Sequence, residues 1–193
     1  MEVTTDSPRA VHAQKLVVEL LASDVPDRVY KPASELELWR RRLGIGRPRF
    51  PAREQPPADL SHPAMAVNLD ACIQCTRCVR ACREAQVNDV IGYAHRGAHS
   101  AIVFDLDDPM GESSCVACGE CVQACPTGAL APAHDAYLAP VDRKVSSVCP
   151  YCGVGCQITY HVHGNAIVRV EGRDGPANRE RLCVKGRFGY DFI

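Results

Sequence analysis

The sequence predicts an α+β fold in which a helical segment precedes two small cysteine-rich domains. The evidence is two helical patterns near the N-terminus, a repeated cysteine motif in the middle, and alternating apolar residues near the C-terminus. All twelve cysteines of the 193-residue chain lie between Cys72 and Cys183. We therefore expect a helical segment with a connector over 1–63, a tandem cysteine-motif domain over 64–140 and a third, smaller domain over 141–193.

Composition excludes several classes of function. Lys and Arg number 22 against 23 Asp and Glu, so the chain lacks the basic surplus typical of nucleic-acid binding. No stretch approaches the roughly 20 apolar residues of a membrane span, and the acidic N-terminus is unlike a signal peptide. We expect no nucleic-acid partner, no membrane span, and a cytoplasmic chain with reduced thiols rather than disulfides.

Two helices are expected in the N-terminal segment. Residues 10–22 place leucines and valines at helical spacing, and Pro26 should end that helix. Residues 34–43 follow, with Ser34 and Glu37 at the spacing of a capping box. Gly44 comes directly after the last apolar residue, as at a helix C-terminus.

The second helix carries Leu36, Trp39 and Leu43 on one face, and Arg40–Arg42 near its C-terminus, where positive charge is favoured. Two interpretations of the apolar stripe stay open. It docks a partner subunit, or it packs against the next domain of this chain. Half of the prolines lie between Pro26 and Pro63, so the following stretch is predicted to be an extended connector with a boundary near residue 64.

The middle of the chain contains an internal duplication. Residues 70–82 read DACIQCTRCVRAC and residues 113–125 read SSCVACGECVQAC, and both have the form C-x2-C-x2-C-x3-C. In two-cluster ferredoxins the first three cysteines of such a run bind one iron–sulfur cluster and the fourth binds the other. The spacing therefore predicts two 4Fe-4S clusters with exchanged fourth ligands. Cluster 1 would be held by Cys72, Cys75, Cys78 and Cys125, and cluster 2 by Cys115, Cys118, Cys121 and Cys82.

Small residues in the loops, Ala117 and Gly119, are expected to let backbone amides approach the sulfurs, and Pro126 to fix a turn. Zinc is the alternative metal, but it usually takes two separated pairs of ligands, and these runs do not divide that way. Two short helices should follow the cysteine loops, with small antiparallel strands around them.

The last four cysteines form another pattern, in which three lie close together and the fourth is distant. Between them, Ile158, Tyr160 and Val162 alternate, followed by Gly164-Asn165 and a second apolar run, which predicts a β-hairpin. Gly153 and Gly155 would permit positive φ or close approach to a cluster. We expect a third 4Fe-4S cluster here, and zinc stays open as the alternative. Cluster 3 would be held by Cys149, Cys152, Cys156 and Cys183.

Taken together, residues 67–193 resemble the iron–sulfur part of the large subunit of molybdenum- or tungsten-dependent formate dehydrogenases. The resemblance rests on the tandem cysteine motif followed by CPYCGVGC at 149–156 and CVKGRFG at 183–189. It implies a bis-pyranopterin guanine dinucleotide with Mo or W in a downstream domain. It also implies that Lys185 lies between cluster 3 and the pterin, and that the partners are other redox subunits, flavin- or NAD-linked or ferredoxin-like.

The N-terminal part departs from that pattern. LLASDVPDRVYKPASELELW resembles a segment that holds a further cluster through one histidine and three cysteines in related subunits, but Val25 stands at the histidine position and the segment has no cysteine. We expect a retained scaffold there. No catalytic residue is assigned, and the chain alone is expected to lack formate turnover. The seven histidines form no ligand-spaced set and are expected on the surface or in loops.

The predicted function is thus electron transfer through three 4Fe-4S clusters within a formate dehydrogenase. One alternative is a scaffold protein in which the clusters only stabilise the fold. Another is the corresponding part of an NADH dehydrogenase large subunit or an assimilatory nitrate reductase.

Overall fold

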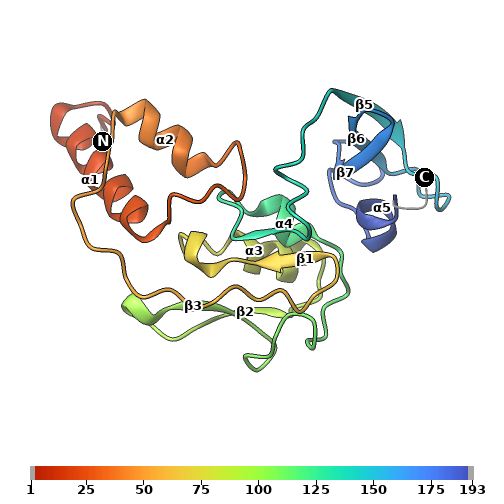
Figure 1. Cartoon of the computed structure of the whole chain (residues 1–193), viewed down its shortest axis with the longest axis horizontal. Coiled ribbons are helices and arrows are strands. Elements are labelled where there is room, and N and C mark those ends of the chain that lie inside the picture. The colour runs from red at the N-terminus through yellow and green to blue at the C-terminus, as the bar shows by residue number, and fades with distance from the viewer. Residues whose placement is uncertain (1–2, 191–193) are drawn as a thin grey trace.

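The chain folds into a pair of N-terminal helices, a central cysteine-bearing unit with two small sheets, and a C-terminal three-stranded sheet (Figure 1). The computed structural model describes residues 3–190. Helices and short antiparallel sheets are mixed along the chain, which confirms the α+β prediction. Within the described residues, none of the helices combines the length and apolar character needed to cross a bilayer.

The first helix is longer than the sequence pattern suggested. Helix α1 (Pro8–Asp24) starts where the Ser7 side chain accepts a hydrogen bond from the Ala10 amide at 3.2 Å, with a proline in the first turn. Such a cap satisfies one of the free N–H groups of the first turn. The helix ends at Val25, which is extended because Pro26 follows.

Helix α2 (Glu35–Leu43) ends as predicted but does not begin as predicted. Gly44 is left-handed at φ 65°, and its N–H bonds back to the last turn. The expected capping box is wrong, because the Ser34 side chain makes no capping hydrogen bond. The Glu37 carboxylate instead pairs with the Arg41 guanidinium at 2.9 Å one turn later, so it is not available to reach back to the helix start.

The apolar stripe of α2 is split between the interior and the solvent. Leu36 is buried, whereas Trp39 keeps 44% of its surface exposed and stacks against Arg42 at 4.9 Å. The start of the helix is fixed to the central unit, because the Glu35 amide donates to the Pro126 carbonyl at 2.9 Å. Packing within the chain therefore accounts for Leu36 but not for Trp39.

The central unit contains two antiparallel strand pairs that connect residues distant in sequence. Strand β1 (Met65–Val67) pairs with β4 (Leu130–Pro132), and β2 (Ile91–Ala94) pairs with β3 (Ala101–Phe104). The short helices between them are η1 (Leu69–Ala71), α3 (Arg77–Arg80), η2 (Ala81–Ala85), η3 (Gly97–His99) and α4 (Glu120–Ala124). The helices expected after the two cysteine loops are thus confirmed as α3, continued by η2, and α4.

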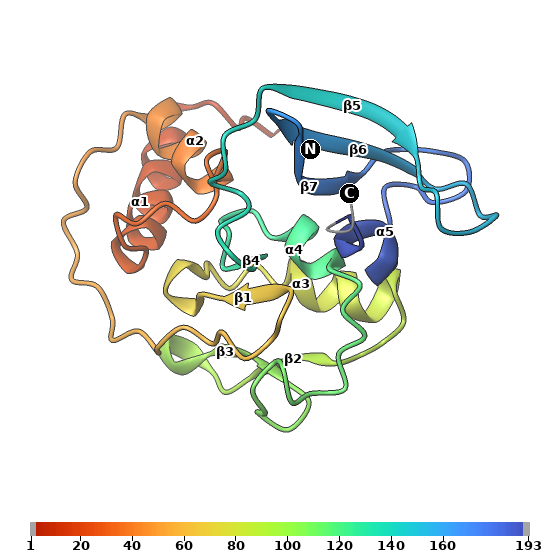
Figure 2. The same ribbon diagram turned by 45° about the vertical axis from the view of Figure 1, so that its right-hand side comes forward.

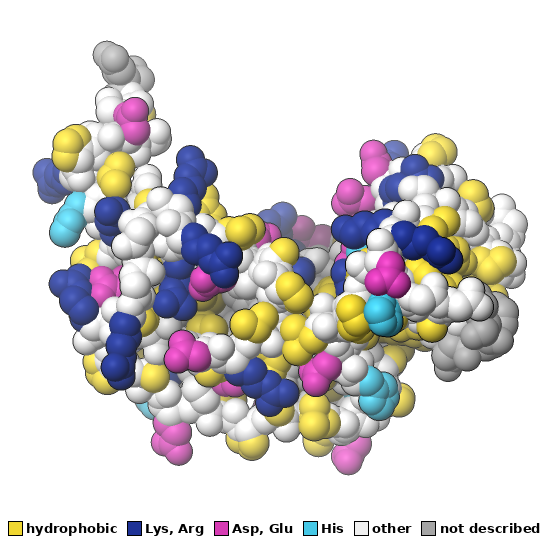
Figure 3. Space-filling model, turned by 45° about the horizontal axis from the view of Figure 1, so that its top comes forward, with side chains coloured by type: hydrophobic (Ala, Val, Ile, Leu, Met, Phe, Trp, Pro, Cys, Tyr) yellow, Lys and Arg dark blue, Asp and Glu magenta, His cyan; other side chains and the backbone are white. Residues whose placement is uncertain are grey.

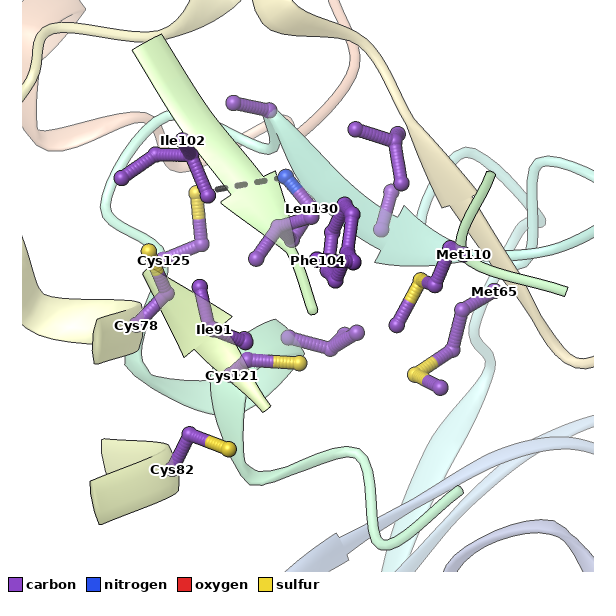
Figure 4. Close-up of a cluster of buried hydrophobic side chains, with 14 of the residues drawn as sticks. Met65, Cys78, Cys82, Ile91, Ile102, Phe104, Met110, Cys121, Cys125 and Leu130 are labelled. Atoms are coloured by element: carbon purple, nitrogen blue, oxygen red, sulfur yellow. Dashed lines mark hydrogen bonds between the residues drawn. The ribbon is translucent and has the colours of Figure 1, made fainter. Parts of the chain in front are cut away.

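The core of this unit is built around the cysteines themselves. Met65 and Met110 are each 1% exposed, and Phe104 and Leu130 pack in the same cluster. Buried cysteines from both repeats belong to this cluster too, and Figure 4 shows their sulfur atoms among the apolar side chains. Cys78, Cys82, Cys121 and Cys125 thus lie in the interior of the unit, whereas Cys75 is exposed.

The C-terminal unit is a three-stranded antiparallel sheet in the order β5-β6-β7. Strands β6 (Gln157–His163) and β7 (Ala166–Gly172) form the predicted hairpin, and Gly164 in its turn has φ 57°. Strand β5 (Arg143–Val148) was not predicted, because its sequence RKVSSV is largely polar and exposed. Helix α5 (Val184–Phe188) follows and lies beside α4 of the central unit (Figure 2).

Strand β6 has buried side chains on both of its faces, which corrects one expectation about the histidines. Ile158 and Val170 face a small core with Leu182. On the opposite face His161 is only 1% exposed, and its Nε2 atom lies 2.9 Å from a Glu171 oxygen.

The second face is covered because the neighbouring Arg169 reaches the central unit, where it stacks over Tyr137 at 5.5 Å and donates to the Ala136 carbonyl at 3.3 Å. His62 is buried as well, and its Nδ1 atom accepts from the Ala64 amide at 3.1 Å. The expectation of surface or loop histidines is therefore wrong for His161, which is buried within β6, whereas His62 lies in a loop as expected although it is buried.

Candidate iron–sulfur sites

The four thiols expected to hold cluster 1 surround one small cavity. Cys72, Cys75 and Cys78 line it from the first repeat and Cys125 from the second, with apolar side chains between them. Figure 4 shows the sulfur atoms of Cys78 and Cys125 next to each other. Burial, followed by the nearby thiols Cys125, Cys72 and Cys75, raises the pKa of Cys78 to about 12.

The thiols expected to hold cluster 2 are also close enough to one another to raise one another's pKa. Burial raises the pKa of Cys115, and Cys118 and Cys82 raise it further. The pKa of Cys121 is well above its usual value, first because of burial and then because of neighbouring thiols that include Cys82. Cys78 of the first set is among those neighbours, so the two sets are adjacent.

Backbone amides point at the sulfurs in the same way in both repeats. The Gln74 amide donates to Cys72 Sγ and the Ala117 amide to Cys115 Sγ, each at 3.4 Å. Both donors have positive φ, 56° and 55°. Glutamine serves as well as alanine, so the left-handed backbone turn, and not the small side chain that we expected, aims these amides at sulfur.

The fourth cysteine of each repeat also accepts an amide hydrogen bond. The Val90 amide donates to Cys82 Sγ at 3.4 Å and the Leu130 amide to Cys125 Sγ at 3.5 Å. Val90 directly precedes β2, and Leu130 is the first residue of β4. Figure 4 shows the bond from Leu130 to Cys125 as a dashed line. Amide donors of this kind stabilise sulfur that carries negative charge.

The third set of thiols is more open to solvent. Cys149 is buried, whereas Cys152 and Cys183 are exposed. The pKa of Cys156 is raised by burial and then by the other three thiols of this set, which are therefore close to it. The loop is closed by a hydrogen bond from the Cys149 amide to the Cys156 carbonyl at 2.9 Å, and Gly155 has the positive φ that we expected, 73°.

Lys185 lies on α5, two residues after Cys183, and its side chain is exposed. Together with Gly186 and Tyr151 it lines a shallow depression beside the third thiol set. The lysine is thus at the border of that set and open to solvent.

The donor atoms of these three sets are those that iron–sulfur clusters require. All twelve cysteines are free thiols, and each set combines four sulfur donors. Over residues 3–190, no three His, Cys, Asp or Glu side chains converge as the ligands of a single metal ion would. In a cubane each thiolate binds a different iron, so four thiols gathered around a common space suit such a cluster.

Two cations that contact the cysteine loops were missed by the sequence reasoning. The Lys31 Nζ donates to the Cys125 carbonyl and the Arg187 Nε to the Cys118 carbonyl, each at 2.8 Å. Lys31 has no sequence signal, since it lies 94 residues from its partner. Arg187 lies inside the CVKGRFG motif, so that motif was the one available indication.

Comparison with protein families identifies both cysteine-bearing regions. Residues 62–131 match the NADH-quinone oxidoreductase subunit 3, ferredoxin-like domain, and residues 142–193 match the molybdopterin oxidoreductase Fe4S4 domain. Among solved structures, a chain of NAD+-reducing [NiFe]-hydrogenase in the H2-reduced state is similar with a TM-score of 0.64 and 22% identity. The similarity covers 72% of this chain and 61% of that one, and at this identity it supports the fold alone.

Curated relatives extend the similarity to most or all of the chain. A subunit of an NADH-quinone oxidoreductase of Rhizobium meliloti is 34% identical over 100% of this chain and 23% of its own length. "Probable oxidoreductase YjgC" of Bacillus subtilis is 31% identical over 70% of this chain and 18% of its own. "Putative formate dehydrogenase SH0748" of Staphylococcus haemolyticus is 31% identical over 64% and 17%.

The chain therefore spans about a fifth of the length of these relatives. The sequence motifs, the fold and the family matches all give the same two domains in the same order. The tandem cysteine domain comes first and the Fe4S4 domain follows it. On this evidence residues 62–131 form a ferredoxin-like domain of the NADH-quinone oxidoreductase subunit 3 type, and residues 142–193 form a molybdopterin oxidoreductase Fe4S4 domain.

Proposed function

We propose that the chain carries electrons through three 4Fe-4S clusters, between a Mo- or W-bis-pterin site that oxidises formate or reduces CO2 and a partner redox subunit. The observation that supports this most is the division of twelve free thiols into three spatial sets of four, with none left over. The domains would be those expected from the sequence, 1–63, 64–140 and 141–193.

In this proposal Cys82 and Cys125 exchange between the repeats, so the second repeat completes cluster 1 and the first repeat completes cluster 2. Each bound cluster would accept and release one electron. The protein would supply thiolate ligands, amide donors to sulfur such as the one at Gln74, and an apolar surround that excludes water. None of these tasks requires an acid, a base or a nucleophile.

The exposed surface around Cys152 and Cys183 suggests that another domain covers the third thiol set. Val154 and Val184 are 57% and 40% exposed beside Cys152 and Cys183, and apolar groups gathered around a functional site commonly mark a contact surface. We infer that the pterin-binding domain covers this end. The positive charge of Lys185 would then face an anionic pterin and mark the electron route, in agreement with the role that the motif implies.

A second candidate is the corresponding segment of an NADH-quinone oxidoreductase subunit. It is favoured by the Rhizobium meliloti relative, whose similarity includes residues 1–63, whereas the formate dehydrogenase named above matches 64% of the chain. In either case we propose other redox subunits as partners and a reducing, cytoplasmic environment that keeps the thiols free.

The first test is metal content. Anaerobically purified protein should contain about 12 iron and about 12 acid-labile sulfide per chain, as three cubanes require. Stoichiometric zinc with traces of iron would refute the proposal. Three clusters that cannot be reduced by dithionite at any accessible potential would favour the scaffold alternative.

The second test distinguishes the two enzymatic candidates. In the full-length protein with its partners, formate should bleach the visible absorbance of the clusters under anaerobic conditions. Reduction by NADH with no response to formate would favour the second candidate. The chain of residues 1–193 alone should show no formate-dependent dye reduction.

A further inference from the structure

Arg187 is a buried cation that reaches from one iron–sulfur domain into the other. Its side chain is 4% exposed, although it starts on the short helix α5 of the C-terminal unit. Its Nε donates to the Cys118 carbonyl at 2.8 Å and one Nη to Gln123 Oε1 at 2.7 Å. The other Nη lies 3.3 Å from Glu120 Oε2, and that carboxylate is only 10% exposed.

The central unit is shaped to receive this side chain. Gly119 has φ 69°, and a Cβ added there would collide with Arg187 Cδ. The equivalent position in the first repeat, Thr76, has the same backbone conformation at φ 56° but carries a side chain. The repeats therefore differ where Arg187 approaches, and the space left by glycine in the second repeat is filled by the guanidinium stem.

Charge near a cluster changes how easily the cluster takes up an electron. Reduction adds a negative charge, which a buried cation stabilises and a buried carboxylate opposes, and both effects are large where water is excluded. Both charges lie at the Cys118 loop. The Arg187 guanidinium is hydrogen-bonded to the Cys118 carbonyl, and the Glu120 carboxylate lies 3.3 Å from that guanidinium.

We propose that Arg187 raises the reduction potential of cluster 2, and that Glu120 opposes it. This inference rests on the proposed function, since it requires cluster 2 to be held by Cys82, Cys115, Cys118 and Cys121. Because Arg187 belongs to the domain of cluster 3, docking of that domain sets the potential of the cluster in the neighbouring domain. Arg187 is a positioning residue here, because it contacts a ligand backbone and not the cluster.

The test is a redox titration of the full chain followed by EPR, with iron content measured in each sample. Arg187→Gln should lower the midpoint potential of one of the three reduction steps and leave the other two in place. Glu120→Gln should raise the same step. Arg187→Lys keeps the charge and should retain most of the wild-type potential.

The double variant Arg187→Gln with Glu120→Gln separates charge from disturbed packing. Both groups are then neutral, so the affected step should return toward the wild-type potential, whereas damage to the domain contact would shift all variants in one direction. Such a common shift would overturn the inference, and so would no shift at all in either single variant that holds a full complement of clusters.

Arg83 provides the matched control at the same cluster. It is adjacent to Cys82 in sequence, but its side chain is 60% exposed and paired with Asp89, so solvent screens its charge. Arg83→Gln should leave all three steps close to their wild-type positions, and a shift as large as that of Arg187→Gln would contradict the role of burial. Samples that lack iron would count against the proposed function itself.

Discussion

Gly119 shows at the residue scale how a missing side chain allows two domains to meet. Its conformation at φ 69° is one that glycine adopts readily, and its open side is filled by Arg187. The left-handed conformation also occurs at Thr76 in the first repeat, so only the missing side chain is particular to the second repeat. The glycine therefore reflects the contact with α5.

We predict that Gly119→Ala destabilises the chain more than the same change at Gly164. Gly164 has φ 57° and no atom within 4 Å of an added Cβ, so its alanine variant should cost only the backbone strain of about 1 kcal/mol. The Gly119 variant must in addition displace Arg187. Urea midpoints of the two variants measure the difference, and equal values would contradict the packing argument.

Glu171 gives a prediction for pH. The hydrogen bond from His161 lowers its pKa most, Arg169 adds to this, and the value falls from 4.5 to about 2. A carboxyl with a lowered folded-state pKa contributes stability above its unfolded pKa and loses it as the pH falls. Stability should thus decline between about pH 4.5 and about pH 2 through this group.

Glu171→Gln lacks that contribution at every pH. It should be less stable than the wild type at neutral pH, and the difference between the two urea midpoints should shrink as the pH falls below about 4.5. Acid loss of clusters affects both proteins, so the difference isolates the carboxyl. A gap that stays constant with pH would show that Glu171 is not the titrating group.

At the scale of elements, helix α2 carries two apolar side chains with different surroundings, a buried leucine and an exposed tryptophan. Leu36 is 6% exposed and contacts the interior of the chain, so Leu36→Ala should lower the free energy of unfolding by about 2–4 kcal/mol. Trp39→Asp should leave folding and iron content unchanged, because Trp39 is 44% exposed and packs mainly on Arg42.

These two variants also test the docking interpretation of the stripe. Trp39 lies on a helix of the N-terminal segment, over which Figure 3 shows Lys and Arg side chains gathered. Partner binding that is weakened by Trp39→Asp with intact clusters would support docking through this helix. Loss of iron in the Trp39 variant would instead show that the stripe supports the fold.

At the scale of the whole molecule, the cysteine-bearing units should lose clusters separately. The third thiol set packs on a core of its own, with Ile158, Val170 and Leu182. Cys183→Ser should therefore reduce iron from about 12 to about 8 per chain and leave the EPR signals of clusters 1 and 2.

Cys121→Ser is the comparison for that experiment. Cys121 is buried in the main core and interacts with thiols of both sets, so its loss should reduce iron by more than one cluster. If both variants lost the same amount of iron, the independence of the C-terminal unit would be wrong.

Much of the architecture follows from local sequence patterns. The end of α2 at Gly44, the turn at Gly164 and the helices after the cysteine loops depend on residues a few positions apart, so short motifs predict them. The duplicated motif likewise implies equal loops, and the matching φ values of Gln74 and Ala117 agree with this.

The remaining features required the tertiary structure, because their partners are distant in sequence. Strand β5 has a polar sequence and exists because β6 offers it a hydrogen-bonding edge. His161 is buried because Arg169 joins its sheet to the central unit. The sequence by itself determined which cysteines group into which motif. Only the fold decided that Arg187 would place its charge against Cys118, since burial and electrostatic interaction depend on proximity in space, which spacing along the chain does not specify across 69 residues.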